Sequence, residues 1–300
     1  MLFSILIANY NNGKFFLDCY KSIINQTYTD WEVIIVDDYS IDDSVQIIKN
    51  IIGLDNRFHL YINDTNKGCG FTKNRCAGLA KGDVLGFLDP DDLLESSALE
   101  AMIKFHALNK HIALISSKYR FISKKGEFIG LGKHGAHIPL GKSYLTYGEG
   151  AITAFATFKR KIYNLTEGID EKMTRAVDQD LYYKLEEQGG TYFIDEILYR
   201  YRLHDNNISR NENLYKSWYW HFYAKKKAFY RRKMLSSVIS NFSNSEFKHI
   251  KSDYYFSRFK FPIKEDSKAN RIYFLFKSLL FSSSSEFKFK IAFLKKHLIN

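Results

Sequence analysis

The sequence contains few residues that cross-link or interrupt a chain. Its 300 residues include three cysteines and three prolines. Cys19, Cys69 and Cys76 are odd in number and lack a metal-ligand spacing, so the sequence argues against a disulfide framework and favours a reducing compartment. No run of about 18 uninterrupted apolar residues is present, and the first ten residues lack the features of a signal peptide. We therefore expect neither a spanning helix nor a leader.

A glycine-rich phosphate loop is also missing. The first apolar run is followed by Asn9-Tyr10-Asn11-Asn12-Gly13. A dehydrogenase requires G-x-G-x-x-G at this place, and a sugar nucleotidyltransferase usually has a glycine-rich loop there. The sequence therefore disfavours a dehydrogenase, and the sugar nucleotidyltransferase is kept as the nearest alternative among enzymes.

Positive charge is concentrated at the end of the chain. Residues 211–300 hold 19 Lys and Arg against 6 Asp and Glu, whereas residues 1–210 hold 25 against 27. The same tail contains 22 of the 49 aromatic residues. This shift in composition predicts a first domain over 1–210 and a basic, aromatic-rich, mainly helical region over 211–300.

The first third of the chain alternates short apolar runs with helical patterns. The predicted strands are 3–8, 32–36, 58–62 and 84–88, and the predicted helices are 14–26, 43–51 and 71–80. Such alternation predicts an α/β fold with an open, mostly parallel sheet. The later, less regular part has predicted strands at 112–117 and 191–194 and a helix at 178–188. The glycine-rich stretch 126–150 is either a mobile loop over a site or a plain surface connection.

Polar residues follow three of the predicted strands. Asn9 and Asn11 follow the first strand, Asp37 and Asp38 the second, and Asp89, Asp91 and Asp92 the fourth. Ligands of open α/β sheets bind beyond the carboxyl ends of the strands. The repeated placement of acids at one sheet edge therefore predicts a ligand site there.

The run Asp89-Pro90-Asp91-Asp92 places carboxylates two residues apart, which point the same way in an extended segment. Crowded carboxylates repel unless a cation lies between them. Mg²⁺ and Mn²⁺ prefer oxygen ligands and commonly share them with substrate phosphates. The alternative is a solvated turn that caps a helix starting near Leu93. For Asp37 and Asp38, contact with a nucleoside and a plain loop or helix cap both stay open.

Three segments occur in order over about 90 residues: SILIANYNN, EVIIVDDYSIDDS and NKGCGFTKNRCAGLAKGDVLGFLDPDD. They resemble the opening strand and turn, the nucleoside-binding segment and the metal motif of family 2 glycosyltransferases, the large inverting class that builds bacterial polysaccharides. The resemblance implies the GT-A fold, a Rossmann-like nucleotide-diphospho-sugar transferase sheet, here with a helical C-terminal appendage. It covers about residues 3–209.

Two later segments match the same family more loosely. GIDEKMTRAVDQDLYYKLEEQGG resembles the acceptor-side segment, which places the catalytic base at Asp178. LYRYRLHDNNIS resembles the closing segment, which places a metal- or diphosphate-binding histidine at His204. The chain departs from the family at Lys73, where Arg with its bidentate fork is common, and at Val177, where Glu is common. Without the resemblance, Asp178 reads as the N-cap of its own helix.

The resemblance implies inverting transfer of a sugar from a nucleotide-diphosphate donor, by frequency in the class a UDP-sugar. The acceptor would be a hydroxyl of a growing cell-surface glycan or a lipid-linked saccharide. Asp178 would be the base, and Mn²⁺ or Mg²⁺ the cofactor. The implied metal ligands are Asp89, Asp91 and His204. The implied donor-binding residues are Ala8, Asn9, Tyr10, Asp37, Asp38, Gly68, Lys73, Asn74, Asp89 and Pro90.

The tail segment 214–233 reads LYKSWYWHFYAKKKAFYRRK, with aromatic residues between cations. Such a helix suits the headgroup zone of an anionic membrane, which would make this a cytoplasmic protein peripheral to the inner face of the plasma membrane. A helical appendage packed on the catalytic domain is equally compatible. A non-enzymatic lipid- or nucleic-acid-binding protein would explain the tail but not the strand-end acids, so no nucleic-acid partner is expected.

Overall fold

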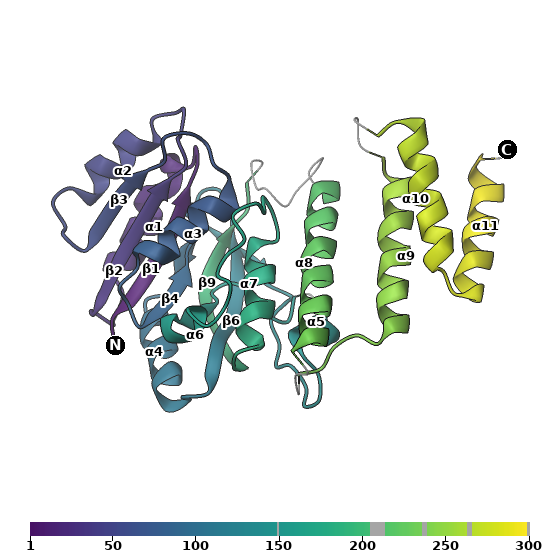
Figure 1. Cartoon of the computed structure of the whole chain (residues 1–300). Helices are drawn as coiled ribbons and strands as arrows, with labels where there is room; N and C mark the ends of the chain where they lie inside the picture. Colours follow the sequence, from purple (N-terminus) through teal and green to yellow (C-terminus); the bar gives the residue numbers. More distant parts are fainter. Residues whose placement is uncertain (149, 205–213, 236–238, 263–265, 299–300) are drawn as a thin grey trace. The chain divides into compact units, whose positions relative to one another are not determined.

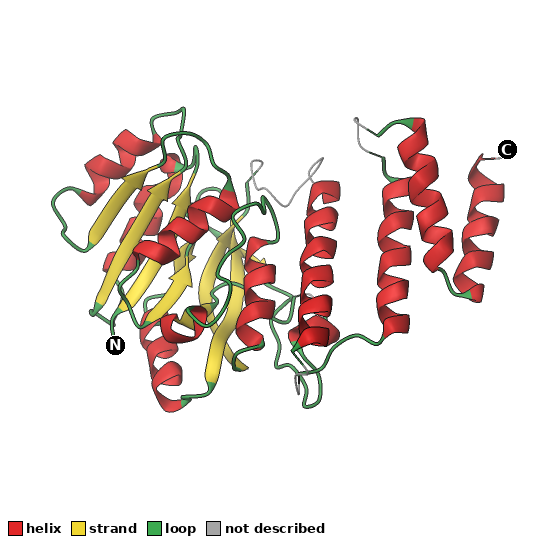
Figure 2. Cartoon of the chain, viewed as in Figure 1, coloured by secondary structure: helices red, strands yellow, loops and turns green. Residues whose placement is uncertain are grey.

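The computed structural model describes residues 1–148, 150–204, 214–235, 239–262 and 266–298, with side chains described except at 214–216 and 296–298. The chain divides into two compact units. One comprises Met1–Asn207 and Ser237–Ser240, and the other Ile208–Ser236 and Asn241–Asn300. The first is an α/β domain and the second is helical (Figures 1 and 2). No helix in the described ranges has both the length and the apolar character needed to cross a membrane.

The first unit is built on one mixed sheet. Its described strands are β1 (Phe3–Asn9), β2 (Trp31–Asp37), β3 (Phe58–Ile62), β4 (Val84–Phe87), β5 (Leu93–Leu94), β6 (Ile112–Ile122), β7 (Phe128–Leu131), β8 (Thr157–Lys159) and β9 (Gly190–Arg202). The order is β3-β2-β1-β4-β8-β6-β9-β5, with β7 paired to β6. The strands β3, β2, β1 and β4 are mutually parallel, and β6 is parallel to β9. The pairs β4–β8, β6–β8, β6–β7 and β5–β9 are antiparallel.

Helices connect these strands and pack against the sheet (Figure 1). The described helices of the unit are η1 (Gly13–Phe15), α1 (Phe16–Ile24), α2 (Ser44–Ile52), α3 (Cys69–Leu79), α4 (Ala98–Leu108), α5 (Tyr144–Tyr147), α6 (Arg160–Tyr163) and α7 (Val177–Glu186). α3 contacts β1 and β2, whereas α4 and α7 contact β6. The continuous apolar runs of β1 and β2 are almost entirely buried, which matches strands covered on both faces.

The predicted α/β fold is confirmed, with the parallel order concentrated in the first four strands. The alternative interpretation of the acidic run, a cap on a helix starting near Leu93, is wrong. Leu93–Leu94 form β5, which pairs with β9, and α4 begins only at Ala98, after its N-cap Ser97. Asp92 is therefore no helix cap, because its carboxylate binds β9 instead. The glycine-rich stretch 126–150 contains β7 and α5.

The second unit consists of α8 (Leu214–Met234), α9 (Asn244–Lys260), α10 (Lys268–Phe281) and α11 (Ser284–Leu298) in the described residues. Aromatic rings join α8 to α9. The ring centroids of Phe229 and Phe247 lie 3.9 Å apart, and those of Phe222 and Tyr254 4.2 Å apart. Stacked aromatic residues of α8 and α9 therefore form part of the core of this unit.

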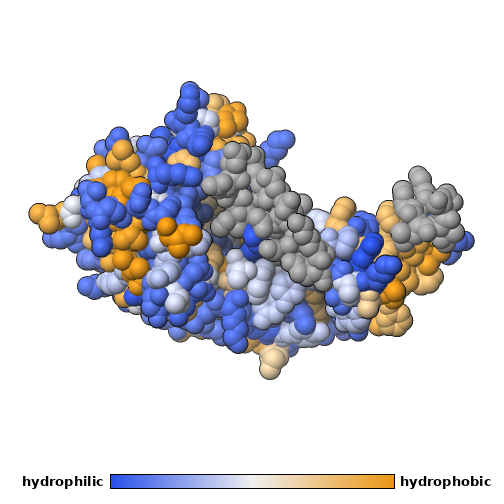
Figure 3. All heavy atoms as spheres, turned by 90° about the horizontal axis from the view of Figure 1, so that it is seen from above, coloured by the Kyte–Doolittle hydropathy of each residue, from blue (hydrophilic) through white to orange (hydrophobic). Residues whose placement is uncertain are grey.

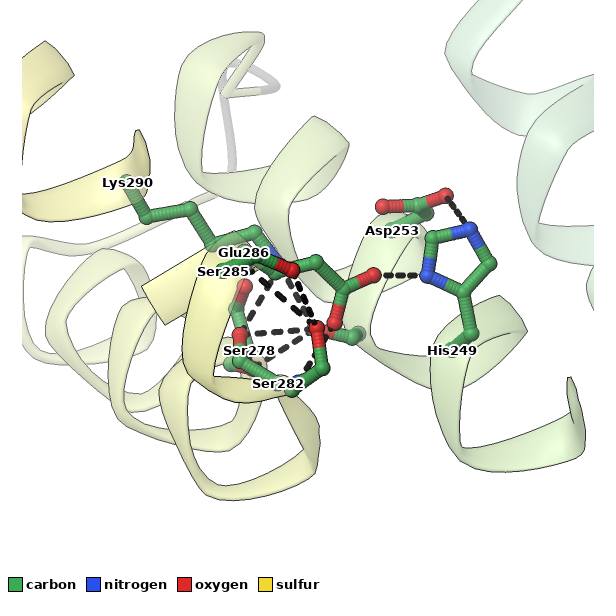
Figure 4. A network of polar contacts seen from close by, with 9 residues as sticks. His249, Asp253, Ser278, Ser282, Ser285, Glu286 and Lys290 are labelled. Carbon is green, nitrogen blue, oxygen red and sulfur yellow. Dashed lines mark hydrogen bonds and ion pairs between the residues drawn. The ribbon is translucent and has the colours of Figure 1, made fainter. Parts of the chain in front are cut away.

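A polar network joins α9, α10 and α11 (Figure 4). The buried Lys290 Nζ donates hydrogen bonds to Ser252 Oγ (2.5 Å) and Ser282 Oγ (3.1 Å). Ser252 Oγ in turn donates to the Ser278 carbonyl at 2.8 Å. Burial lowers the pKa of Lys290 from its ordinary value. The network gives the ammonium hydrogen-bond acceptors on α9 and at the end of α10, and it fixes the three helices against one another.

Candidate active site

The carboxyl ends of β1 and β2 are joined by a buried hydrogen-bond network. Asn9 and Asp37 are register partners at the ends of the two strands. The fully buried Asp37 carboxylate accepts hydrogen bonds from Asn9 Nδ2 (2.6 Å), Ser40 Oγ (2.6 Å) and Ser40 N (2.8 Å). In the described residues, the buried Oδ1 atom of Asn9 has no hydrogen-bond partner. Asp37 therefore holds the turn after β2 and presents no accessible oxygen to a ligand.

Asp38 binds the loop that leads into α3. Its Oδ1 accepts from Asn63 Nδ2 (2.7 Å) and Lys67 N (2.8 Å), and its Oδ2 accepts from Gly68 N (2.8 Å). Gly68 has φ +90°, a conformation that side-chain-bearing residues rarely adopt, and it is the N-cap of α3. Asp38 is buried, so it too acts on the protein's own loop in this structure.

Three loops carry non-glycine residues in the left-handed region of φ. Across the described ranges these residues are Asn11 (φ 52°), Tyr39 (φ 63°) and Ala176 (φ 52°). They lie after β1, after β2 and immediately before α7. Each such position costs about 1–3 kcal/mol and persists where the surroundings impose it, commonly at functional sites. Tyr10 and Tyr39 are half-exposed beside the first two loops.

The acidic run after β4 contains one carboxylate bound to β9 and one bound to a histidine. Asp92 accepts hydrogen bonds from Tyr199 Oη and Arg202 N, both at 2.7 Å. Burial, with Asp91 and Asp89 nearby, raises the pKa of Asp92 well above its ordinary value. Asp91 Oδ2 lies 2.7 Å from His204 Nε2. Asp92 therefore anchors the run, while Asp91 and His204 form a contact pair as the sequence comparison with the family implied.

Arg202 is a residue that sequence reasoning missed. Its side chain is almost fully buried, and its Nε donates to the Asp91 carbonyl at 2.7 Å. Its Nη2 donates to Asp18 Oδ2 at 2.9 Å, and its guanidinium lies 5.2 Å from the Phe15 ring centroid. Arg202 thus ties the acidic run to β9 and to α1. Its place two residues before His204 was the available signal, but sequence alone does not distinguish a buried arginine from an exposed one.

Lys73 interacts with two carboxylates from distant parts of the chain, Asp178 and Asp89. Its Nζ is 2.7 Å from Asp178 Oδ1 and 4.8 Å from the Phe87 ring centroid. Burial opposes the charged form, but Asp178 and Asp89 together raise the pKa of Lys73 well above its ordinary value. Lys73 is therefore a buried, protonated ammonium. Asp178 by contrast has a side chain that is 43% exposed, so it can meet a second molecule.

The start of α7 positions Asp178. Ala176 is the N-cap and Asp178 lies in the first turn, so Asp178 is not the N-cap that its sequence alone suggested. Gly70 at the start of α3 donates its N–H to the Met173 carbonyl at 2.9 Å, and a Cβ on Gly70 would meet backbone at 2.4 Å. This close approach holds the segment before α7 against α3. Asp180 is buried and paired with Lys184 at 2.8 Å, which removes it from competition as a base.

The remaining predicted donor-binding residues line the same region of the fold. Asn74 donates to Glu171 Oε1 at 2.8 Å and accepts from Tyr163 Oη at 3.1 Å, so its amide joins α3 to the loop before α7. Ala8 lies near the end of β1, and Pro90 is buried within the acidic run. Ala8 and Pro90 thus lie near the carboxyl ends of β1 and β4. Asn74, Asp37 and Asp38 form hydrogen bonds that hold loops.

The oxygen and nitrogen donors of Asp89, Asp91 and His204 suit Mn²⁺ or Mg²⁺. Although Asp89 is solvent-exposed, desolvation raises its pKa to about 6, with Lys73 opposing and Asp91 and Asp178 adding to the shift. In the described residues, the three-residue group whose ligand atoms all lie within 4.8 Å of one another is a different one, His249, Asp253 and Glu286. Asp91 and His204 therefore form a preassembled pair, and Asp89 stands apart from it.

The family model for glycosyl transferase family 2 matches residues 4–166. The chain is 35% identical to chondroitin synthase of Escherichia coli over 214 residues, which is 69% of this chain and 30% of that protein. The chain spans between 21% and 30% of the length of the first three curated relatives that it matches.

Two solved structures have the same fold. The structure of S. aureus TarS 1-349 in complex with UDP matches with a TM-score of 0.65 and 18% identity, covering 94% of this chain and 81% of that one. The mannosyltransferase PcManGT from Pyrobaculum calidifontis, in complex with GDP-Man and Mn²⁺, matches with a TM-score of 0.58 and 12% identity, covering 99% and 81%.

These similarities confirm the family and the GT-A-like α/β fold that the motifs implied. They give no support to the sugar nucleotidyltransferase or to a non-enzymatic binding protein. Since the family model covers more than half of the chain and ends well beyond the acidic run, the chain belongs to glycosyl transferase family 2 and is a glycosyltransferase.

Proposed function

We propose that this protein transfers a sugar, with inversion, from a nucleotide-diphosphate donor to a hydroxyl of a growing cell-surface glycan or lipid-linked saccharide. UDP is the proposed nucleotide. The observation that carries the proposal is the Lys73 ammonium 2.7 Å from the Asp178 carboxylate, together with the Asp91–His204 pair. The likeness to chondroitin synthase and to a UDP-bound structure supports it.

Asp178 is the proposed general base. Its half-exposed carboxylate takes the proton from the acceptor hydroxyl as the oxygen attacks the anomeric carbon. A bond forms between the acceptor oxygen and that carbon, while the bond from carbon to the diphosphate oxygen breaks on the opposite face. Such proton transfer is typically worth about 10²–10⁴-fold in rate.

Asp91, His204 and Asp89 are the proposed residues that hold Mn²⁺ or Mg²⁺. When bound, the ion neutralises charge on the departing diphosphate. Asp92 and Arg202 keep Asp91 in position from β9, through the hydrogen bonds to Tyr199 and to the Asp91 carbonyl. The chain therefore holds Asp91 in a fixed position.

We propose that Lys73 pairs first with Asp178 and then with the diphosphate of the donor. In the structure it pairs with Asp178 at 2.7 Å. The diphosphate of a donor would offer it a second anion, and moving the ammonium toward that anion would leave Asp178 available to the acceptor. Lys73 would thus couple donor binding to the exposure of the base.

The nucleoside is proposed to lie against the loops after β1 and β2. Asp37 and Asp38 would act by fixing these loops, because their oxygens already accept hydrogen bonds from the protein. Tyr10 is half-exposed there, and the buried Oδ1 of Asn9 lacks a partner among the described residues. Backbone at Ala8 and Gly68 would complete the surface.

Thermal unfolding with UDP or GDP, each with Mn²⁺ and with EDTA, tests this proposal. We expect UDP with Mn²⁺ to raise the melting temperature and neither component alone to do so. The physical reason is that a ligand bound only by the native state stabilises it by mass action. A larger rise with GDP would replace the proposed nucleotide, and no metal-dependent rise with either would contradict the donor class.

A further inference from the structure

One face of α10 is apolar and exposed. The exposed fractions are 67% for Ile272, 50% for Tyr273, 61% for Phe276 and 59% for Leu280. At about 100° per residue, these four positions fall within one arc of about 100° around the helix. We call these four side chains the α10 apolar face. Figure 3 shows residues of high hydropathy on the surface of the helical unit.

The opposite side of α10 packs inside the unit. Phe274 and Phe281 stack on Tyr255 of α9, with ring centroids 6.3 Å and 6.0 Å apart. Ser278 is buried and its carbonyl accepts from Ser252. Helix α10 therefore has its own packed face, and Ile272, Phe276 and Leu280 are additional apolar surface. Tyr273 lies at the border of the two faces, because its ring also meets Tyr255 edge-on with centroids 6.5 Å apart. Phe289 of α11 is also 63% exposed.

The charge around this face is positive. The tail holds 19 Lys and Arg against 6 Asp and Glu. The acids among the described residues are engaged within the unit: Asp253 and Glu286 contact His249, Asp266 pairs with Arg258, and Glu246 accepts from Ser243 N. On α10 itself, Lys268 and Lys277 flank the face at the two sides of its arc.

We propose that the α10 apolar face lies in the headgroup region of an anionic lipid bilayer. An amphipathic helix in the plane of a membrane inserts its apolar side chains and meets anionic headgroups with Lys and Arg. Tyr273 suits the interface because its ring has one polar end. At 14 residues and with Lys277 in it, α10 is too short and too charged to span. Two copies of so basic a tail would repel each other, which favours lipid over self-association.

The proposal is independent of the catalytic residues, so its failure would leave the proposed transfer intact. The test is sedimentation of the full chain with phosphatidylcholine vesicles, with and without phosphatidylglycerol. We expect binding to the anionic vesicles that weakens with salt. The double variant Phe276→Ser with Leu280→Ser should bind about tenfold or more weakly, since it removes inserted apolar surface.

The matched control is Leu140→Ser with Leu165→Ser, two exposed leucines of the first unit. This control should bind vesicles as the unmodified chain does, and circular dichroism should give the same helix content for both double variants. Equal vesicle binding by the α10 variant and the control would overturn the proposal. Lipid-free dimerisation in analytical ultracentrifugation that the α10 variant abolishes would also overturn it, by assigning the face to a second copy.

Discussion

The loops after β2 and β4 both begin with acidic residues at the same sheet edge, yet the protein treats their carboxylates differently. After β2, Asp37 and Asp38 are buried and accept hydrogen bonds from side chains and from backbone N–H groups. After β4, Asp92 is likewise buried and bound to β9, whereas Asp89 is exposed and the carboxylate of Asp91, also buried, contacts His204. Hydrogen bonding thus separates loop-holding acids from acids that are available to a ligand.

This difference shows why residue type alone does not assign a role. A carboxylate that accepts several hydrogen bonds from its own loop fixes that loop. Within the described part of the chain Asp89 has no such donors, and desolvation, with Asp91 and Asp178 adding to it, raises its pKa to about 6. The comparison predicts that substitutions after β2 act mainly on stability, whereas those around Asp91 and Asp178 act mainly on metal binding and turnover.

The largest effect is expected for Asp178→Asn. Removing the base should lower sugar transfer about 10²–10⁴-fold, while the affinity for UDP stays nearly unchanged. The measurement is UDP release from UDP-sugars in the presence of acceptor, with Asp30→Asn as the control because Asp30 is an exposed acid. Turnover by Asp178→Asn at the control's rate would remove Asp178 as the base.

The next largest effect is expected for Asp91→Asn. Losing an anionic ligand should lower turnover about a hundredfold or more, because metal stabilisation of a leaving diphosphate is worth several kcal/mol. The Mn²⁺ concentration that gives half-maximal UDP release should rise as well. An unchanged Mn²⁺ dependence would contradict the proposed metal ligand.

A smaller effect on turnover is expected for Asp37→Asn, together with a larger effect on folding. The amide would place its NH₂ against the donors of Asn9 and Ser40, and each lost or mismatched buried hydrogen bond costs about 1–3 kcal/mol. Chemical denaturation should therefore give a lower free energy of unfolding than for Asp91→Asn. Equal free energies of unfolding for the two variants would contradict the proposed difference between the two loops.

The smallest effect is expected for Lys73→Arg. The guanidinium keeps the positive charge that Asp89 and Asp178 require, so turnover should change only a few-fold. Lys73→Met, which removes the charge at similar length, is the informative partner and should lose far more. Similar turnover of the two variants would exclude a role for the charge.

The sequence predicted the elements that local pattern determines. The strand predicted at 58–62 coincides with β3, the strand at 3–8 is one residue shorter than β1, and the strand at 32–36 is one residue shorter than β2 at each end. It did not predict β5, because pairing of Leu93 with Arg200 depends on a strand more than 100 residues away. It predicted four residues of β9, which has 13, since the register with β6 supplies the remainder.

For the site, the motifs located the acids but not their environments. From the sequence, Asp92 can be either a metal ligand or a helix cap. In the structure its carboxylate binds Tyr199 and Arg202 instead. These partners lie 107 and 110 residues away, so no local pattern could reveal them. The same holds for Lys73 and Asp178, which are 105 residues apart in sequence and form an ion pair.

The most direct test of the contrast between the two loops is calorimetric titration of UDP into the full chain, Asp91→Asn and Asp37→Asn, each with Mn²⁺ and with EDTA. The account predicts that Mn²⁺ strengthens UDP binding by the unmodified chain and by Asp37→Asn, but not by Asp91→Asn. A gain from Mn²⁺ that survives in Asp91→Asn and disappears in Asp37→Asn would contradict it.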